Sequence, residues 1–272
     1  MSGGRLRSIL RRGGESAPRD DALPIPPLEM RRLVGPTDPA AFDNPDGALV
    51  YPCLDERLYA RVFDFGCGCG RIARQLIQQS PRPERYVGVD LHRDMVRWCR
   101  RNLEPRAPGF AFHHHDVVNV SFNPGQGKPS TRPLESDDDF ATLVNAWSVF
   151  THLLEDQAAF YLREVARILE PGGVFHGTWF LTDKRLFPMM RTHQNALYIN
   201  TVDPTNAVVF DREWLRSQAA EAGLAIVAAR RPEVRGYHWV IQMQLLGEGV
   251  EPIELPPDEA PIAPEPVEAD ED

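Results

Sequence analysis

The 272-residue sequence predicts an α/β fold with a doubly wound, mostly parallel sheet of seven strands, the last of them antiparallel. Two observations support this prediction. Strand-like apolar segments alternate along the chain with helix-like segments, as in parallel sheets that helices cover on both faces. A glycine-rich loop joins the first of these strands to the first helix, at a place where open α/β sheets bind ligands. Together these features indicate a Rossmann-like arrangement.

The predicted elements follow one another closely from the first strand onward. Strands are expected at residues 61–65, 86–89, 110–114, 141–146 and 174–181, with helices at 71–79, 93–103 and 155–169. The Pro-Gly-Gly sequence at 171–173 stops the third helix. Asp211 is expected to cap a fourth helix, which Gly223 ends. Strands at 224–229 and 237–246 complete the sheet, and the short loop between them indicates an antiparallel pair.

Both ends of the chain differ in composition from its middle. Residues 1–25 are rich in Gly, Arg and Pro and lack periodicity, whereas residues 248–272 are acidic and contain six prolines. We expect two disordered tails, one basic and one acidic, around a single domain at 26–247. Within this domain, the insertion at 182–210 is expected to form a lid, because long ordered loops are commonly functional. Residues 28–58 are expected to cover the binding pocket as well.

The net charge is informative only when the acidic end is considered separately. The chain carries −9 at pH 7, but ten acidic residues and no basic residue lie in 248–272. The rest of the chain is nearly neutral, which gives no support for nucleic acid as a partner. No apolar run approaches the ~20 residues that a membrane span needs, and the N-terminal segment lacks the apolar region of a secretory signal. We therefore expect a cytoplasmic protein that binds neither nucleic acid nor membrane.

Cysteine and histidine patterns predict no disulfide framework and no metal site. The chain has no CxxC pair, and two of its four cysteines lie in the glycine loop, a usage that suits a reducing compartment. The run His113, His114 and His115 is not expected to bind a metal ion. Adjacent residues of a strand point to opposite faces of the sheet, so three in a row do not converge on one ion.

The loop after the first strand combines three glycines with an acidic residue. Asp64 is followed by Gly66, Gly68 and Gly70 in a GxGxG spacing. The glycines let the backbone turn tightly and approach a ligand closely. NAD-binding folds use a similar loop, but with GxGxxG spacing and a pyrophosphate that a neighbouring carboxylate disfavours. Asp64 therefore favours a sulfonium cofactor with an ammonium group over a dinucleotide.

Two further aspartates end the second and third strands. Asp90 lies twenty residues after Gly70, where a carboxylate can accept hydrogen bonds from both ribose hydroxyls. Asp116 is placed to accept a hydrogen bond from an adenine amino group. Either aspartate alone could simply cap the helix that follows. Together with Asp64, however, they give three acidic residues at three successive strand ends. Because these ends share one edge of the sheet, the pattern predicts a cofactor site there.

Residues 62–181 resemble the core of class I S-adenosylmethionine-dependent methyltransferases. The resemblance rests on the glycine motif, on Asp90 and Asp116, and on the Leu-Glu-Pro-Gly-Gly turn at 169–173. It implies S-adenosylmethionine as the cofactor and S-adenosylhomocysteine as its product. It also implies a set of cofactor-binding residues, namely Asp64, Gly66, Cys67, Gly68, Gly70, Asp90, Leu91, Asp116, Val117 and Asn145.

A narrower resemblance lies in Asn123-Pro124-x-Gly and in the segment 147–153. Both are similar to motifs of bacterial methyltransferases linked to sugar and polysaccharide modification. This implies O-methyl transfer to a small-molecule hydroxyl, such as that of a sugar or a partly methylated oligosaccharide, and leaves a homo-oligomer possible. The alternatives are an N-methyltransferase for a small molecule or a protein, and a non-catalytic cofactor-binding protein. A nucleic-acid methyltransferase is disfavoured, since an Asn-Pro-Pro-aromatic motif is missing after the fourth strand.

A hydroxyl acceptor requires a base, because it is a poor nucleophile near pH 7. A positioned general base contributes ~100- to 10,000-fold, and histidine is the usual candidate. His152 follows the fourth strand and is our first candidate, although it could instead pack against or cap the next helix. His238 enters the last strand and is our second. His176 lies inside a strand and is expected to be structural, whereas His193 falls in the predicted lid.

Overall fold

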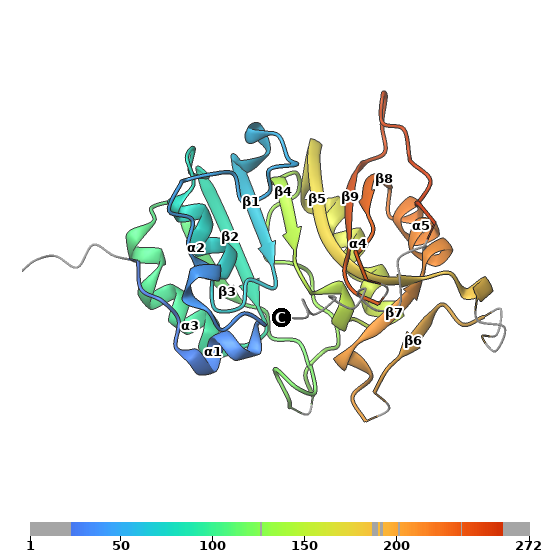
Figure 1. Ribbon diagram of the computed structural model, residues 1–272, viewed down its shortest axis with the longest axis horizontal. Helices are drawn as coiled ribbons and strands as arrows, with labels where there is room; N and C mark the ends of the chain where they lie inside the picture. The colour runs from blue at the N-terminus through green and yellow to red at the C-terminus, as the bar shows by residue number, and fades with distance from the viewer. Residues whose placement is uncertain are drawn as a thin grey trace, which may run out of the picture.

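A computed structural model describes residues 23–257, apart from 126, 187–189, 191–192, 201 and 235. The sheet has the order β3-β2-β1-β4-β5 and continues into β9 and β8 (Figure 1). Strands β1 to β5 pair in parallel, whereas β9 runs antiparallel to both β5 and β8. The strands are β1 Arg61–Phe65, β2 Arg85–Asp90, β3 Phe110–His114, β4 Ala141–Ala146, β5 Leu169–Thr182, β6 Ala196–Tyr198, β7 Val208–Asp211, β8 Leu224–Arg230 and β9 Trp239–Leu245. The predicted fold class, mostly parallel with an antiparallel last strand, is confirmed.

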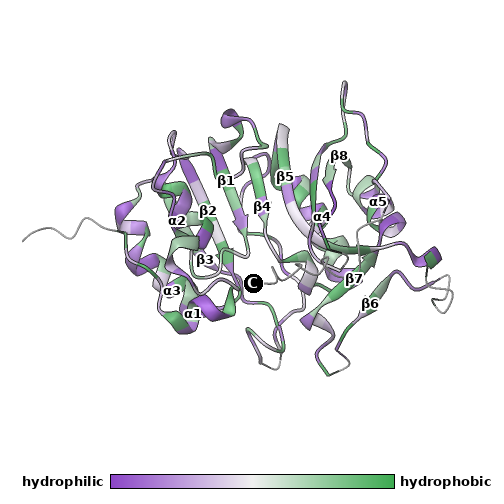
Figure 2. Cartoon of the chain, in the orientation of Figure 1, coloured by the Kyte–Doolittle hydropathy of each residue, from purple (hydrophilic) through white to green (hydrophobic). Residues whose placement is uncertain are grey.

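Helices cover both faces of this sheet. Two successive residues of β1 point to opposite faces of the sheet. Val62 packs in an apolar core with residues of α2 and α3, whereas Phe63 packs in a second core with residues of α4 and α5. The central strands β1 and β4 are accordingly largely hydrophobic in Figure 2. No helix in the described part of the chain is long and apolar enough to cross a membrane. The α-helices are α1 Leu28–Leu33, α2 Arg71–Gln78, α3 Arg93–Asn102, α4 Glu155–Ile168 and α5 Arg212–Glu221, and the 3-10 helices are η1 Pro39–Phe42, η2 Glu56–Tyr59, η3 Glu104–Arg106, η4 Phe150–His152, η5 Lys184–Leu186 and η6 Pro204–Asn206.

The predicted number of strands is wrong, because two strands lie in the insertion at 182–210. β6 and β7 form an antiparallel pair, and β7 runs parallel to residues 180–182 at the end of β5. β5 is correspondingly long, since it begins at Leu169 and passes through a register shift before it pairs regularly with β4 from Val174. Strands of three and four residues offer too short a pattern for sequence periodicity to reveal. Part of the expected lid therefore extends the sheet.

The inner ends of both expected tails contact the domain. The carbonyls of Leu23 and Pro24 accept hydrogen bonds from the buried guanidinium of Arg74. At the other end, Ile253 donates its backbone N–H to β8, and Leu255 is buried in the core that contains α4 and α5. Residues 1–22 and 258–272 lie outside the described residues, so the disorder predicted for them stays a prediction.

Candidate cofactor and acceptor site

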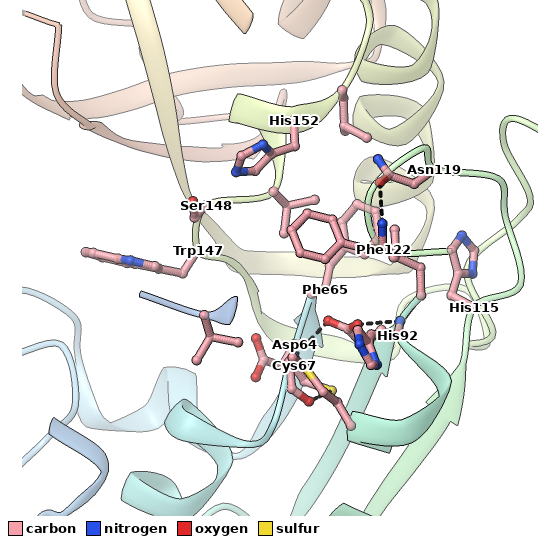
Figure 3. A pocket seen from close by; sticks show the side chains of 18 of the residues that line it. Asp64, Phe65, Cys67, His92, His115, Asn119, Phe122, Trp147, Ser148 and His152 are labelled. Carbon is pink, nitrogen blue, oxygen red and sulfur yellow. Dashed lines mark hydrogen bonds between the residues drawn. The ribbon is translucent and has the colours of Figure 1, made fainter. Parts of the chain in front are cut away.

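A cavity of about 190 Å³ opens at the carboxyl ends of β1, β2 and β4 (Figure 3). Its walls come from the glycine loop, from the strand ends, from α1 and from the loops that follow β3 and β4. The cavity brings together nine of the predicted site residues, namely Asp64, Gly66, Cys67, Gly68, Asp90, Leu91, Val117, Asn145 and His152. The remaining three, Gly70, Asp116 and His238, are not among the residues that line it.

The glycine loop turns where a side chain would not fit. Gly66, Gly68 and Gly70 all have positive φ angles, of 82°, 54° and 82°. A Cβ atom on Gly66 would lie 2.3 Å from the side chain of Val149, and one on Gly68 would lie 2.7 Å from that of Val34. Val149 and Val34 themselves line the cavity. The first two glycines therefore let the loop pack tightly between cavity walls, as the sequence predicted.

Gly70 has a different role from the other two glycines. It is the N-cap of α2, and a Cβ atom there would lie 2.6 Å from Leu103 and 3.0 Å from the sulfur of Cys99. Both neighbours belong to the packed core between α2 and α3, away from the cavity. The structure therefore gives Gly70 a packing role at the start of α2.

Asp90 presents a carboxylate that is held by two backbone groups. The N–H of Gly68 donates to its Oδ2 at 2.8 Å, and the N–H of His92 donates to its Oδ1 at 2.7 Å. Burial raises the pKa of Asp90, and these two hydrogen bonds oppose the shift. Each oxygen keeps a further lone pair. The carboxylate can therefore accept hydrogen bonds from two hydroxyls of a ligand in the cavity.

Asp64 anchors a network of buried hydrogen bonds beside the glycine loop. Its carboxylate accepts from the hydroxyl of Tyr86 and from the side-chain amide of Asn145, both at 2.6 Å. Asn145 in turn accepts a hydrogen bond from the hydroxyl of Tyr51 at 2.8 Å. Burial raises the pKa of Asp64 to about 6 despite its two donors. A cationic group in the cavity would favour the ionised carboxylate, so Asp64 and Asp90 together fit a ligand with an ammonium and hydroxyls.

Asp116 does not reach the cavity with its carboxylate. The side chain accepts hydrogen bonds from Asn123 at 3.0 Å and forms an ion pair with Lys128 at 2.9 Å, and these contacts lower its pKa to about 2. Asn123 also donates to the carbonyl of Val117 at 2.7 Å. The Asn-Pro-x-Gly motif therefore fixes the loop after β3. Val117 and the preceding His115 line the cavity in place of Asp116.

His152 lies at the wall of the cavity opposite the glycine loop (Figure 3). Its Nδ1 lies 3.0 Å from the backbone carbonyl oxygen of Thr205. A carbonyl can only accept, so Nδ1 carries the proton and Nε2 of the neutral ring keeps a lone pair. The Phe122 ring contacts the imidazole edge-on at 6.4 Å. This arrangement suits a general base in the cavity that Asp64 and Asp90 also line.

His238 contacts a residue of the cavity wall but is not among the residues that line the cavity. Its ring stacks on Phe180 at 4.9 Å and contacts Trp147 edge-on at 6.3 Å. Burial lowers the pKa of His238, and His152 and Arg71 add to the shift. Trp147 lines the cavity, whereas His238 does not. The geometry therefore favours His152 over His238 as the base.

An aromatic group that no sequence motif predicted packs around Trp147 at the cavity wall. Trp147 stacks with Tyr51 at 6.0 Å, and the guanidinium of Arg71 lies 5.9 Å from the Trp147 ring centroid. His176 lies 4.2 Å from Tyr51 and is buried, and burial lowers its pKa to about 4. The tryptophan stood inside a recognised motif. Its contact with Tyr51, almost a hundred residues earlier, had no local signal.

The three consecutive histidines point to different partners. His115 contacts the hydroxyl of Tyr161 at 2.8 Å, His114 contacts the carbonyl of Leu91 at 3.0 Å, and His113 lies near Glu135. Among residues 23–257 that the structure describes, no group of three potential ligands lies close enough to hold a metal ion.

Comparison with known proteins places the matching region around this site. Residues 62–173 match the family model of a methyltransferase domain. A fatty-acid O-methyltransferase of Mycolicibacterium smegmatis is 34% identical over 115 residues, which cover 42% of this chain and 35% of that enzyme. A phthiotriol/phenolphthiotriol dimycocerosates methyltransferase of Mycobacterium tuberculosis is 28% identical over 117 residues, or 42% of this chain and 36% of the relative. The matches thus span about a third of the length of these relatives.

Among solved structures, a SAM-dependent methyltransferase from Methanosarcina mazei aligns with a TM-score of 0.47 and 20% identity, covering 69% of this chain and 93% of that one. The description of the family model and the names of the curated relatives agree with the methyltransferase class that the sequence motifs predicted. Residues 62–173, which contain the glycine loop and Asp90, are therefore the part of the chain that is similar to known methyltransferases.

Proposed function

We propose that the protein transfers a methyl group from S-adenosylmethionine to a hydroxyl of a small-molecule acceptor, with His152 as the general base. One observation carries this proposal. His152 lines the same cavity as Asp64 and Asp90, and the carbonyl of Thr205 fixes its ring with the Nε2 lone pair free for a proton. A base at this place is what a hydroxyl acceptor needs and what a neutral amine acceptor does not.

Each residue of the site has a defined task in this proposal. When bound, S-adenosylmethionine supplies a methyl carbon that its sulfonium group makes electrophilic. Asp90 accepts hydrogen bonds from the ribose hydroxyls, and Asp64 stabilises the ammonium group. Methyl transfer would require the cavity walls to hold the acceptor oxygen ~3 to 3.5 Å from the methyl carbon. Nε2 of His152 would take the proton that the acceptor hydroxyl loses, and S-adenosylhomocysteine would be the product that leaves.

A sugar or a partly methylated oligosaccharide is the acceptor that the sequence motifs favour. In its narrowest form, the resemblance is to the 1-O-methyltransferase of methylmannose polysaccharide synthesis. Trp147 offers a flat ring at the cavity wall, a surface on which sugar rings commonly stack. The relative named a fatty-acid O-methyltransferase supports transfer to oxygen without supporting a sugar. Cytoplasmic location and homo-oligomer formation remain predictions from the sequence.

A methyl-transfer assay with isotopically labelled cofactor tests this function. The panel contains sugars, partly methylated oligosaccharides, aliphatic alcohols, phenols and amines, each with wild-type protein and with His152→Ala. We expect label in a hydroxyl acceptor, and we expect its transfer to require His152. Efficient labelling of an amine at equal rates by both proteins would replace this proposal with N-methylation. S-adenosylhomocysteine binding without transfer to any acceptor of the panel would favour a non-catalytic role.

A further inference from the structure

Four exposed apolar side chains lie on segments that line the cavity or contact its wall at His152. Val202 is 87% exposed, Ile199 69%, Val120 60% and Leu33 50%. We call these four residues the apolar rim. They lie on three segments, namely α1, the loop after β3 and the loop between β6 and β7. All three segments project from the sheet edge at which β1 and β4 end, at the bottom of Figure 1.

Hydrogen bonds hold two of these segments together beside the proposed base. The hydroxyl of Ser121 donates to Asp203 at 2.5 Å, and the amide of Asn119 donates to the hydroxyl of Thr205 at 3.2 Å. In the sequence, Val120 lies between the two donor residues, Asn119 and Ser121, and Val202 directly precedes the acceptor Asp203. Because the carbonyl of Thr205 also binds the His152 ring, the rim is fixed relative to the base.

The hairpin that carries Ile199 is fixed as well. Asn195 donates its side-chain amide to Glu155 at the start of α4 at 2.9 Å, and the Tyr198 hydroxyl lies 3.3 Å from the other carboxylate oxygen of Glu155. These exposed apolar residues are therefore presented by an anchored backbone.

The rim is continuous with the inside of the cavity. Leu33 itself lines the cavity, and so do Val118 and Phe122, which flank Val120 in the loop after β3. An acceptor whose hydroxyl reaches His152 would therefore pass apolar surface on its way out to the rim. Large exposed apolar patches on soluble proteins commonly mark binding sites.

The charges of these loops restrict the kind of ligand that fits. Residues 117–125 contain no charged side chain, and residues 194–210 contain only Asp203. Asp203 is buried, and its carboxylate is already occupied by Ser121 and Thr205. Neither loop thus presents a charge that would recognise a phosphate or a carboxylate. An uncharged, flexible apolar group matches these two loops better, whereas the charged residues of the third segment, Glu29, Arg31 and Arg32, all lie on α1.

We propose that the acceptor carries an aliphatic chain beside the hydroxyl that is methylated, and that this chain binds along the apolar rim. The inference rests on the proposed O-methyl transfer and specifies its substrate class. The rim is occupied by the chain of the same acceptor molecule whose hydroxyl reaches His152, because the rim continues into the cavity that contains this base.

Chain-length dependence of binding tests this proposal without requiring turnover. The full-length protein, saturated with S-adenosylhomocysteine, is titrated by calorimetry with straight-chain primary alcohols from butanol to nonanol. We expect affinity to rise roughly threefold to fourfold with each added methylene, the gain that burial of one methylene gives. The double variant Ile199→Ser/Val202→Ser should flatten this dependence for the longer alcohols. Both side chains are exposed, so the variant should melt at the wild-type temperature.

Leu246→Ser is the matched control, because Leu246 is 47% exposed but follows β9 at the opposite edge of the sheet. It should keep the wild-type dependence on chain length. An affinity that does not change with chain length, or a slope that is the same in the rim variant, would overturn the proposal. Vesicle binding or self-association that is lost in the rim variant while the slope persists would assign the rim to a membrane or to a second copy instead.

The same series separates this proposal from the proposed function. If His152→Ala abolishes labelling but keeps the wild-type chain-length dependence of alcohol binding, both proposals stand. If wild-type protein binds long alcohols through the rim but labels no hydroxyl acceptor at all, O-methyl transfer fails while the aliphatic binding surface stands.

Discussion

The two sides of the cavity are built in different ways. The side that we propose binds the cofactor, here called the cofactor side, consists of the glycine loop and of Asp64 and Asp90, which lie within one strand-helix-strand unit of thirty residues. The acceptor side is assembled from the loop after β3, from η4 and from the loop before β7, where His152 meets Thr205 across 53 positions. Local motifs therefore describe the first side, whereas the second exists only in the folded chain.

The largest expected effect is on the acceptor side. His152→Ala should lower turnover by ~100-fold or more, because the acceptor proton loses its base. Affinity for S-adenosylhomocysteine should stay near the wild-type value, since in the proposed function His152 contacts the acceptor and Asp64 and Asp90 contact the cofactor. Steady-state kinetics and calorimetry on the same preparation measure both quantities. A variant that turns over normally when folded but melts at a much lower temperature would make His152 a structural residue, and the acceptor side would then lack its proposed base.

The next effect concerns the cofactor side and uses Asp116 as its control. Asp90→Ala should weaken S-adenosylhomocysteine binding ~10- to 100-fold, since a charged hydrogen bond contributes ~1.5 to 3 kcal/mol. Asp116→Ala should change this affinity little, because Asn123 and Lys128 hold the carboxylate outside the cavity. Calorimetric titration measures the affinity of both variants. Equal losses of affinity would support the adenine contact that the sequence predicted for Asp116.

This pair also shows how far the sequence can predict the site. The position of Asp90 in the cavity could be predicted, because this residue ends the strand that follows the glycine loop. Asp116 occupies an equivalent place, yet its side chain turns toward Lys128, which no spacing rule encodes. The contact of Tyr51 with Asn145 joins residues 94 positions apart and was equally hidden. The mostly parallel sheet followed from the alternation of strands and helices, but the short strands β6 and β7 are defined by tertiary pairing that the sequence does not reveal.

A smaller effect tests whether the cofactor side is built at a cost in stability. Burial raises the pKa of Asp64 from 3.8 to about 6, so the folded state binds the proton more tightly than the unfolded state between these pH values. The contribution to stability is present below pH ~4 and is lost as pH rises through about 6. Asp64→Asn should therefore raise the free energy of unfolding above pH 6, by up to ~3 kcal/mol, and converge with wild type toward pH 4.

The same variant should bind S-adenosylhomocysteine more weakly, because a neutral amide would replace the carboxylate that we propose stabilises the ammonium group. Urea denaturation at pH 4, 5, 6 and 7.5 gives the stability profile, and calorimetry gives the affinity. Lower stability at pH 7.5 would show that the carboxylate's hydrogen bonds with Tyr86 and Asn145 outweigh its burial.

The smallest effects are expected at the acidic end, away from both sides of the cavity. Deletion of residues 258–272 should leave the melting temperature and turnover near wild type, because an acidic, proline-rich segment buries little apolar surface. Deletion of residues 251–272 should lower the melting temperature by several degrees, because it removes the buried Leu255 and the hydrogen bond from Arg212 to the Leu255 carbonyl. Leu255→Ala within the full chain should reproduce part of that loss, by ~1 to 3 kcal/mol for a side chain at the edge of a core. Differential scanning calorimetry on the three proteins measures these effects.

If the shorter deletion destabilises the protein as much as the longer one, the segment that packs against the domain extends beyond residue 257. Turnover at a temperature where all three proteins are folded should be equal, because neither Leu255 nor Arg212 lines the cavity.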